Sequence, residues 1–278
     1  MQAQPSANSG KPRGSGISDF MNSNSLVAKI AFLMLALFVF IIVLQLSINL
    51  LARFYTRNTN TQLINGMVDA KQLIIIPQDP SIKGSQTISR SINGPDGIEF
   101  TWSIWIFIDD LQYQSGKFRH IFHKGNDSVE PTTGLNFPNN APGLYLAPDT
   151  NKLVVIMNTY DEIVQEVEVS DIPLNKWVNV IIRCRNTTLD VYINGLITTS
   201  TQLVGVPKQN YGDVYVAMNG GFSGYVSNLW YYSYALGTGA IQDMVKHGPN
   251  IKTSNSYSAM TMKNPDYLSL RWYFYGSN

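Results

Sequence analysis

The chain has 278 residues, a length that suits about two ordinary domains, or one large all-β domain with an appendage. Charged residues make up 14% of the chain, well below the roughly 25% of a typical soluble domain, while 44% hydrophobic residues supply enough apolar surface for a packed core. This composition excludes a charged coiled coil, a collagen-like repeat and a wholly disordered chain, and a net charge of +1 without a Lys/Arg cluster argues against a nucleic-acid partner.

The N-terminal part of the chain changes character at residue 26. Residues 1–25 are mostly Ser, Asn, Gly and Pro, and we expect a disordered tail because they offer little apolar surface to offset the entropy of ordering. Residues 26–52 form an apolar run of 27 residues, which as a helix would be about 40 Å long and would span the roughly 30 Å hydrocarbon layer. The sequence therefore predicts one transmembrane helix, with the lipid bilayer as a partner.

A cleaved signal peptide and a buried core helix are the alternatives, but a signal's apolar region is shorter, about 7 to 15 residues. The orientation of the span is undetermined, because Lys and Arg flank it equally on both sides. Asn126 and Asn186 begin Asn-x-Ser/Thr sequons and are glycosylation candidates if the domain is luminal. The single cysteine, Cys184, excludes an internal disulfide and a Cys-based zinc site.

Residues 53–71 are polar, and we expect a stalk; residues 72–278 form the predicted domain, with a C-terminal extension from about residue 250. A helical period occurs over Thr238–His247. Short strands without long helices between them indicate an all-β, two-sheet antiparallel sandwich. The predicted strands are Gln72–Ile76, Gln86–Ile92, Ile98–Ile108, Phe118–His123, Gly143–Leu146, Lys152–Tyr160, Ile163–Val169, Trp177–Arg185, Thr188–Ser200, Val214–Met218, Phe222–Tyr232 and Tyr267–Tyr275.

Two neighbouring segments carry the strongest local signals. Asp190–Ile197 alternates apolar and polar residues and contains Asn194-Gly195, a pair that tolerates positive φ and predicts a tight hairpin. Upstream, the strand that starts at Trp177 places Cys184 on its apolar face, so we expect that side chain in the core.

The run "IPLNKWVNVIIRCRNTTLDVYINGLI" resembles the signature of laminin-G-like domains of the concanavalin A-like lectin/glucanase superfamily. The segments "EFTWSIWIFI", "HIFHKG" and "GYVSNLWYYSYALGTGAIQDMVKHGP" are similar to other parts of that family, in the same order. The resemblance covers about residues 86–249 and implies a concanavalin A-like jelly roll. It implies no single function, since this fold hosts lectins, glycosidases, adhesion modules and structural proteins.

A hydrolase would need two carboxylates placed across a sugar ring, and Glu166 and Glu168 share a strand face. Their spacing differs from the Glu-x-Asp-x-x-Glu pattern of the superfamily's glucanases, so we expect a solvated strand face and no catalytic residues. His120 and His123 lie three apart on a predicted strand and should point to opposite faces, so we expect no metal site.

Calcium is an alternative cofactor, because Asp109 with Asp110, or Asn126 with Asp127, could supply oxygen ligands. Too few further ligands are visible, and we expect no cofactor. Recognition needs other groups: sugars stack on aromatic rings while amides and carboxylates take up their hydroxyls. The candidate ligand-binding residues are Tyr145, Asn158, Tyr160, Trp230, Tyr231 and Tyr232.

Three functional hypotheses follow. The first is a single-pass, membrane-anchored, non-enzymatic recognition or adhesion protein that binds a glycan or protein surface. The second is a structural membrane protein of a large DNA virus particle, a minor capsid protein or a tether of the virion's internal membrane, with capsid or membrane proteins as neighbours. The third is a membrane-tethered glycan hydrolase.

Overall fold

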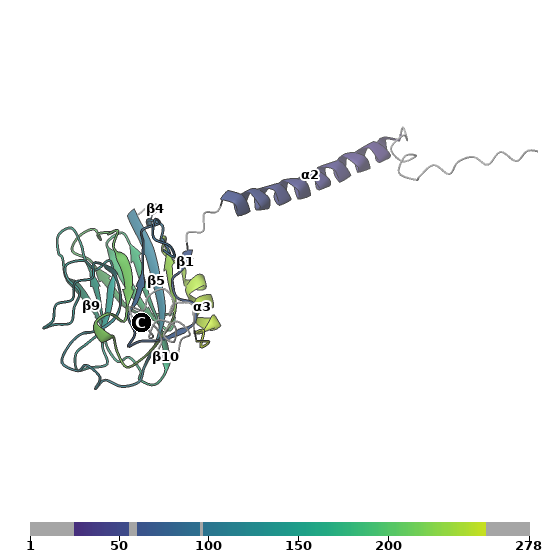
Figure 1. The fold of residues 1–278 in the computed structure, drawn as a ribbon. Coiled ribbons are helices and arrows are strands. Elements are labelled where there is room, and N and C mark those ends of the chain that lie inside the picture. The colour runs from purple at the N-terminus through teal and green to yellow at the C-terminus, as the bar shows by residue number, and fades with distance from the viewer. Residues whose placement is uncertain (1–24, 56–59, 95–96, 254–278) are drawn as a thin grey trace, which may run out of the picture. The chain divides into compact units, whose positions relative to one another are not determined.

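A computed structural model of the chain describes residues 25–55, 60–94 and 97–253. The chain divides into two compact units, residues 1–57 and 58–278. The described part of the first unit is one helix, and the second unit contains the described strands (Figure 1). Residues 1–24 of the expected tail and the predicted strand Tyr267–Tyr275 lie outside the described residues.

Helix α2 spans Leu26–Tyr55, over the apolar run of the sequence. Its segment Leu26–Leu51 has a mean hydropathy of 3.0 and is long and apolar enough to cross a membrane, a criterion that a signal sequence can also satisfy. Large apolar side chains such as Phe38 and Leu46, each 63% exposed, cover its surface. A helix that is apolar on all sides is typical of a membrane span.

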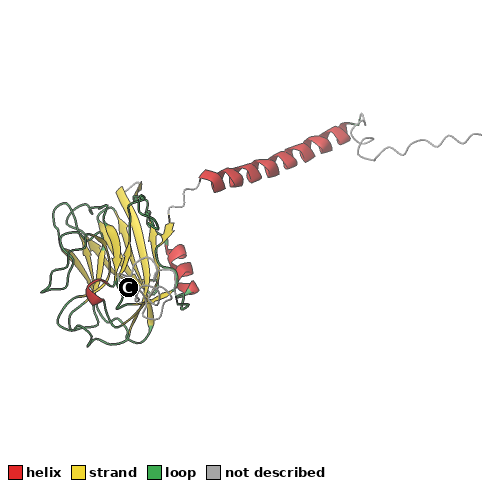
Figure 2. Cartoon of the chain, viewed as in Figure 1, coloured by secondary structure: helices red, strands yellow, loops and turns green. Residues whose placement is uncertain are grey.

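The second unit is a sandwich of two antiparallel sheets, which confirms the predicted fold class (Figure 2). Sheet A has eight strands in the order β1-β14-β5-β10-β11-β12, with β2 paired to β14 and β4 paired to β5, and sheet B has the order β3-β13-β6-β7-β8-β9. The strands of sheet A are β1 (Asn60–Gln62), β2 (Met67–Asp69), β4 (Ile92–Gly94), β5 (Gly97–Ile108), β10 (Trp177–Arg185), β11 (Thr188–Ile193), β12 (Leu196–Gln202) and β14 (Gly224–Tyr232). Those of sheet B are β3 (Ile74–Ile76), β6 (Arg119–Gly125), β7 (Gly143–Leu146), β8 (Leu153–Met157), β9 (Gln165–Val169) and β13 (Asp213–Val216).

The core lies between the sheets. Period-two alternation along β5 turns Phe100, Trp102 and Ile104 inward, where each is at most 3% exposed. Cys184 on β10 is fully buried in the same core, as the sequence predicts, and burial raises the pKa of its thiol to about 12. This cysteine is therefore a small apolar core residue.

The expected stalk over residues 53–71 is wrong in its second half. Strands β1 and β2 both pair with β14, and the intervening Leu63 and Ile64 are fully buried. The backbone N–H groups of both residues donate to the carbonyl of Leu229, over 2.8 and 3.2 Å. Three-residue edge strands carry almost no alternation, so the sequence pattern does not reveal them.

The expected strand Gln86–Ile92 is also wrong, because only Ile92–Gly94 forms a strand there, as β4. The predicted hairpin is confirmed: Asn194 and Gly195, with φ of 50° and 80°, join β11 to β12. The expected single strand Thr188–Ser200 is therefore two strands.

Helix α3 spans Thr238–His247 as predicted, and the short 3-10 helix η1 spans Met218–Gly220. Ile241 of α3 is fully buried against Ile181 of β10 and Leu236. Since the neighbours of Ile181 along β10 face the core, α3 packs on the outer face of sheet A.

Candidate binding groove on the outer face of sheet A

A bulge in β14 decides which aromatic rings face outward. Its pairing with β5 shifts by one residue before Trp230, at Asn228, whose φ is 49°. Asn tolerates this left-handed backbone better than most residues do. Val226 faces the core, and uninterrupted alternation would turn Trp230 inward as well. The inserted residue reverses the phase, so Tyr231 enters the core while Trp230 and Tyr232 face out.

The outward rings line a groove between sheet A and α3, about 520 Å³ in volume, which we call the aromatic groove. Trp230 and Tyr232 stack with ring centroids 6.0 Å apart and an interplanar angle of 21°. Tyr234 meets Tyr232 edge-on, with centroids 6.0 Å apart at 80°. The lining residues are Gln62, Asn65, Ser103, Trp105, Asn228, Trp230, Tyr232, Tyr234, Leu236, Ala240, Asp243, Met244, His247, Gly248 and Asn250.

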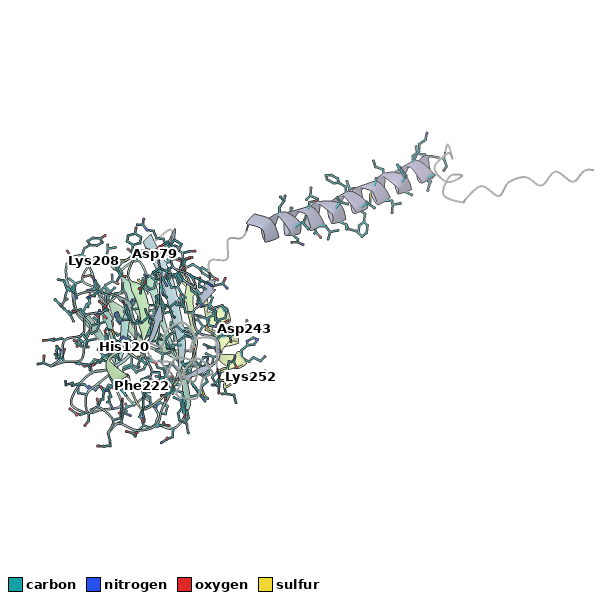
Figure 3. The ribbon with its side chains drawn as sticks, in the orientation of Figure 1. Asp79, His120, Lys208, Phe222, Asp243 and Lys252 are labelled. Carbon is teal, nitrogen blue, oxygen red and sulfur yellow. The ribbon has the colours of Figure 1, made fainter. Side chains whose placement is uncertain are left out.

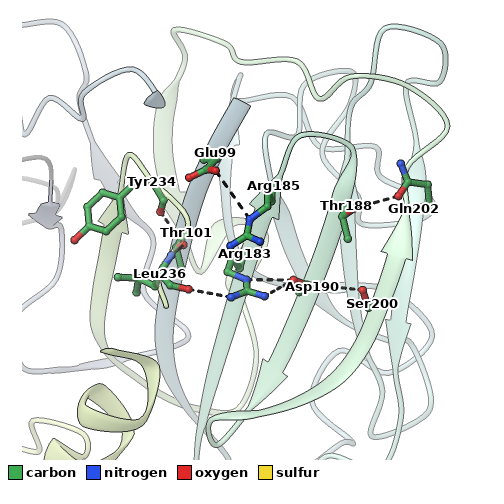
Figure 4. Close-up of polar contacts among 10 residues, drawn as sticks. All are labelled: Glu99, Thr101, Arg183, Arg185, Thr188, Asp190, Ser200, Gln202, Tyr234 and Leu236. Carbon is green, nitrogen blue, oxygen red and sulfur yellow. Dashed lines mark hydrogen bonds and ion pairs between the residues drawn. The ribbon is translucent and has the colours of Figure 1, made fainter. Parts of the chain in front are cut away.

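The segment between β14 and α3 is fixed to the sheet by polar contacts (Figure 4). Thr101 Oγ1 donates to the carbonyl of Tyr234 over 2.9 Å and accepts from the backbone N–H of Leu236 over 3.0 Å. Arg183 donates to the carbonyl of Leu236 over 3.0 Å and forms an ion pair with Asp190 over 2.7 Å. These contacts hold one wall of the groove in place, so the groove is preformed.

Polar groups lie among the rings. Asn250 Nδ2 donates to Asn65 Oδ1 over 2.9 Å, and the Asn65 amide NH₂ makes no hydrogen bond to a described residue. His247 Nδ1 donates to the backbone carbonyl of Asp243 over 2.6 Å, while the Asp243 side chain is exposed. Free amide donors and an exposed carboxylate beside aromatic rings can bind the hydroxyls of a ligand whose apolar face lies on the rings.

The structure brings two of the six predicted ligand-binding side chains, Trp230 and Tyr232, together in the groove. Tyr160 is 71% exposed but lies outside it, with the Lys208 ammonium 5.3 Å from its ring centroid.

The other three predicted ligand-binding side chains are buried and do not line the groove. The Tyr145 hydroxyl donates to Asn140 Oδ1 over 2.6 Å, and burial raises the pKa of this phenol. Asn158 Nδ2 donates to the carbonyl of Pro138 over 2.7 Å, so this amide stabilises the loop that contains Pro138. Tyr231 packs in the core between the sheets.

Several groove residues are not among the predicted ligand-binding residues, for example Trp105, Tyr234 and the α3 residue Asp243. Trp105 could have been found by counting along β5, since it alternates with Ile104 and Ile106, which face inward. Tyr234 and Asp243 carry no such signal, because the path of the chain after β14 places them.

His120 and His123 contact each other, so the expectation that they face opposite sides is wrong. The pairing of β6 with β7 shifts at Ile121, which brings both rings to one face. The backbone N–H of Met218 donates to His120 Nδ1 over 3.0 Å, so His120 Nε2 carries the proton and donates to His123 Nδ1 over 2.6 Å. His123 Nε2 then donates to the carbonyl of Asn126 over 2.8 Å.

This chain of hydrogen bonds uses all four ring nitrogens of the pair. Burial lowers the pKa of His120 well below its usual value and the pKa of His123 to about 4, so both rings are neutral at pH 7. Among the described residues, no group of three or more His, Cys, Asp and Glu side chains is placed to hold a metal ion. The pair is a buried structural element.

The remaining candidate sites have local partners. Glu166 and Glu168 are both exposed on β9, and Glu168 forms an exposed ion pair with Lys152 over 3.1 Å. At the first sequon, Asn126 Nδ2 donates to the carbonyl of Phe137 over 3.0 Å. The nitrogen to which a glycan would be attached is therefore already engaged in a hydrogen bond.

The second sequon residue, Asn186, is half-buried in a turn with φ of 52°. Asp110, a possible calcium ligand, accepts from the backbone N–H groups of Gln112 and Tyr113 over 2.8 and 2.9 Å. These bonds lower the pKa of Asp110 and give its carboxylate a turn-capping role.

Comparison with known proteins supplies the wider context. Comparison with curated proteins finds no match. Among solved structures, the receptor-binding domain of botulinum neurotoxin D is similar at 13% identity with a TM-score of 0.47, covering 68% of this chain and 44% of that one. The binding domain of botulinum neurotoxin DC, solved in complex with rat synaptotagmin II, gives 14% identity and a TM-score of 0.47, covering 68% and 52%.

This chain thus spans about half the length of those proteins, and similarity of this degree carries no information on what it binds. The sequence profile of the Concanavalin A-like lectin/glucanases superfamily, in its laminin G form, matches residues 83–242, which include most of the sandwich and the β14 rings of the aromatic groove. The chain belongs to the Concanavalin A-like lectin/glucanases superfamily.

Proposed function

We propose that this protein is a non-enzymatic recognition protein that is anchored in a membrane by α2 and binds carbohydrate in the aromatic groove. The observation that carries the proposal is the outward-facing pair Trp230 and Tyr232, which the bulge at Asn228 turns away from the core. Half-buried stacked rings that line a groove beside the free amide donors of Asn65 suit the alternating apolar faces and hydroxyl edges of a sugar.

The expected affinity for a single sugar is weak. A pyranose that covers about 50 Å² of apolar ring surface gains about 1.3 kcal/mol at ~25 cal/mol per Å². A few hydrogen bonds between the sugar hydroxyls and polar groups of the groove add about 1 kcal/mol each. The translational and rotational freedom lost on association offsets much of this gain. Many copies anchored in one membrane would bind a polyvalent glycan far more tightly, because each further contact is intramolecular.

The placement of the carboxylates on the sandwich favours a binding function over glycoside hydrolysis. Glycoside hydrolysis needs two carboxyl groups about 5 to 9.5 Å apart. Asp243 is the one carboxylate among the described lining residues of the groove, and the exposed pair Glu166 and Glu168 lies on β9, outside it.

The proposal is tested by screening the full-length chain, held in lipid nanodiscs, against an array of glycans. We expect a defined set of glycans to bind, and Trp230→Ala to abolish that binding. Tyr225→Ala is the matched control, because Tyr225 is an exposed aromatic residue of the same strand outside the groove. Equal loss in both variants, or full binding by Trp230→Ala, would refute the groove as the site.

A further inference from the structure

A second cavity, about 410 Å³ in volume, opens between the two sheets, and we call it the end cavity. Phe100, Trp102 and Tyr231 of sheet A and Met157 of sheet B line it. Loops that include Asp79 and Lys208 form its mouth, and Figure 3 shows both residues at the same end of the sandwich. Its size falls in the range of small-molecule sites, about 300 to 1,000 Å³.

The inner wall of this cavity is aromatic. Trp102 is 1% exposed and Tyr231 is 4% exposed, and their rings pack with centroids 4.9 Å apart at an angle of 59°. Such a wall suits the apolar part of a bound molecule.

Lys124 supplies hydrogen-bond donors at this cavity. It is only 8% exposed, and its ammonium makes one hydrogen bond, to the carbonyl of Gly212 over 2.6 Å, among the described residues. An ammonium has three donors, so two are left for a ligand. Burial lowers the pKa of this amine to about 8, and the charge of the Asp213 carboxylate opposes this shift only in part.

The charges around the cavity favour an anion. Three cationic side chains line it, Arg90, Lys124 and Lys208, against the two carboxylates Asp79 and Asp213. The balance of one positive charge, the spare N–H groups of Lys124 and the aromatic interior together suit a ligand with one negative group on an apolar body.

We propose that the end cavity binds a small amphipathic carboxylate such as a fatty acid, with the carboxylate accepting from Lys124 and the apolar chain packed among Trp102, Tyr231 and Met157. This site is separate from the aromatic groove and does not depend on the function proposed for it.

The test is titration calorimetry of the full-length chain in lipid nanodiscs with octanoate, octanol and octylammonium, after subtraction of each probe's heat with empty nanodiscs. We expect saturable binding of octanoate, at least tenfold tighter than that of octanol, and no saturable binding of octylammonium. Absence of saturable octanoate binding, or equal affinity for octanoate and octanol, overturns the proposal.

Variants locate the site. Lys124→Met should weaken octanoate binding about tenfold and leave the affinity for octanol within twofold. Ala141→Leu, which fills the cavity from a different position, should weaken both probes. Trp230→Ala is the matched control in the aromatic groove and should leave octanoate binding unchanged. Wild-type affinity in both Lys124→Met and Ala141→Leu would overturn the assignment, and the three-probe comparison on the wild type decides the question if either variant fails to fold.

Discussion

The buried pair His120 and His123 should make the sandwich lose stability in mild acid. Both rings are at most 1% exposed, and every ring nitrogen is already engaged. A further proton on His123 Nδ1 would face the N–H of His120, and one on His120 Nδ1 would face the backbone N–H of Met218. Protonation must therefore break the chain of hydrogen bonds.

The sign and size follow from linkage. Burial, opposed in part by the hydrogen bond to Asn126, lowers the pKa of His123 from 6.5 to about 4, so the unfolded state binds the proton more tightly. The stabilisation is fully present above pH 6.5 and is lost as the pH falls toward 4. Between pH 7 and pH 5 this one group lowers the free energy of unfolding by about 2 kcal/mol. His120, whose pKa is also lowered, adds to the loss with the same sign.

The assay is urea unfolding of the full-length chain in nanodiscs, followed by tryptophan fluorescence at pH 7 and pH 5. The variant His123→Gln keeps one acceptor and one donor for the two neighbours but does not titrate, so it should lose less stability than the wild type over this pH range. Equal pH dependence in the variant and the wild type, or no dependence in the wild type, would refute the account of the pair.

Three further predictions concern other parts of the chain. Arg183→Met should lower the free energy of unfolding by about 3 kcal/mol, because the Asp190 side chain is only 8% exposed and would lose its cationic partner, keeping only the hydrogen bond from Ser200; a loss below about 1 kcal/mol would contradict this. Asn228→Val should cost about 1 to 2 kcal/mol through its positive φ and reduce glycan binding, and unchanged melting and binding would speak against the bulge. The full-length chain should remain in the membrane pellet after alkaline carbonate extraction, whereas release into the supernatant would exclude α2 as an anchor.

The parts of the fold that the sequence predicts are those with a local physical cause. The hairpin at Asn194-Gly195 follows from the positive φ that these two residues tolerate, and α3 follows from its apolar spacing. The inward row of β5 follows from alternation. Strands β1 and β2 could not be predicted in the same way, because pairing with β14, more than 150 residues later in the chain, creates them.

The candidate site shows the same division. Trp230 and Tyr232 were predicted from their chemistry, but the expectation that Tyr231 would join them fails because neighbouring residues of a strand face opposite sides. The bulges at Asn228 in β14 and Ile121 in β6 each reverse that alternation for the rest of the strand. Neither residue type by itself predicts a bulge from the sequence. The wrong prediction that His120 and His123 face opposite sides follows from the bulge at Ile121.

The most direct test of the central claim is to find where a bound glycan touches the protein. A glycan from the array that carries a photoreactive diazirine would be cross-linked to the full-length chain, and the labelled peptides identified by mass spectrometry. The account predicts labels within residues 228–234 and 240–250, the two segments that contain most of the groove-lining residues. Labels confined to the loop around Tyr160, or to the mouth of the end cavity, would contradict it.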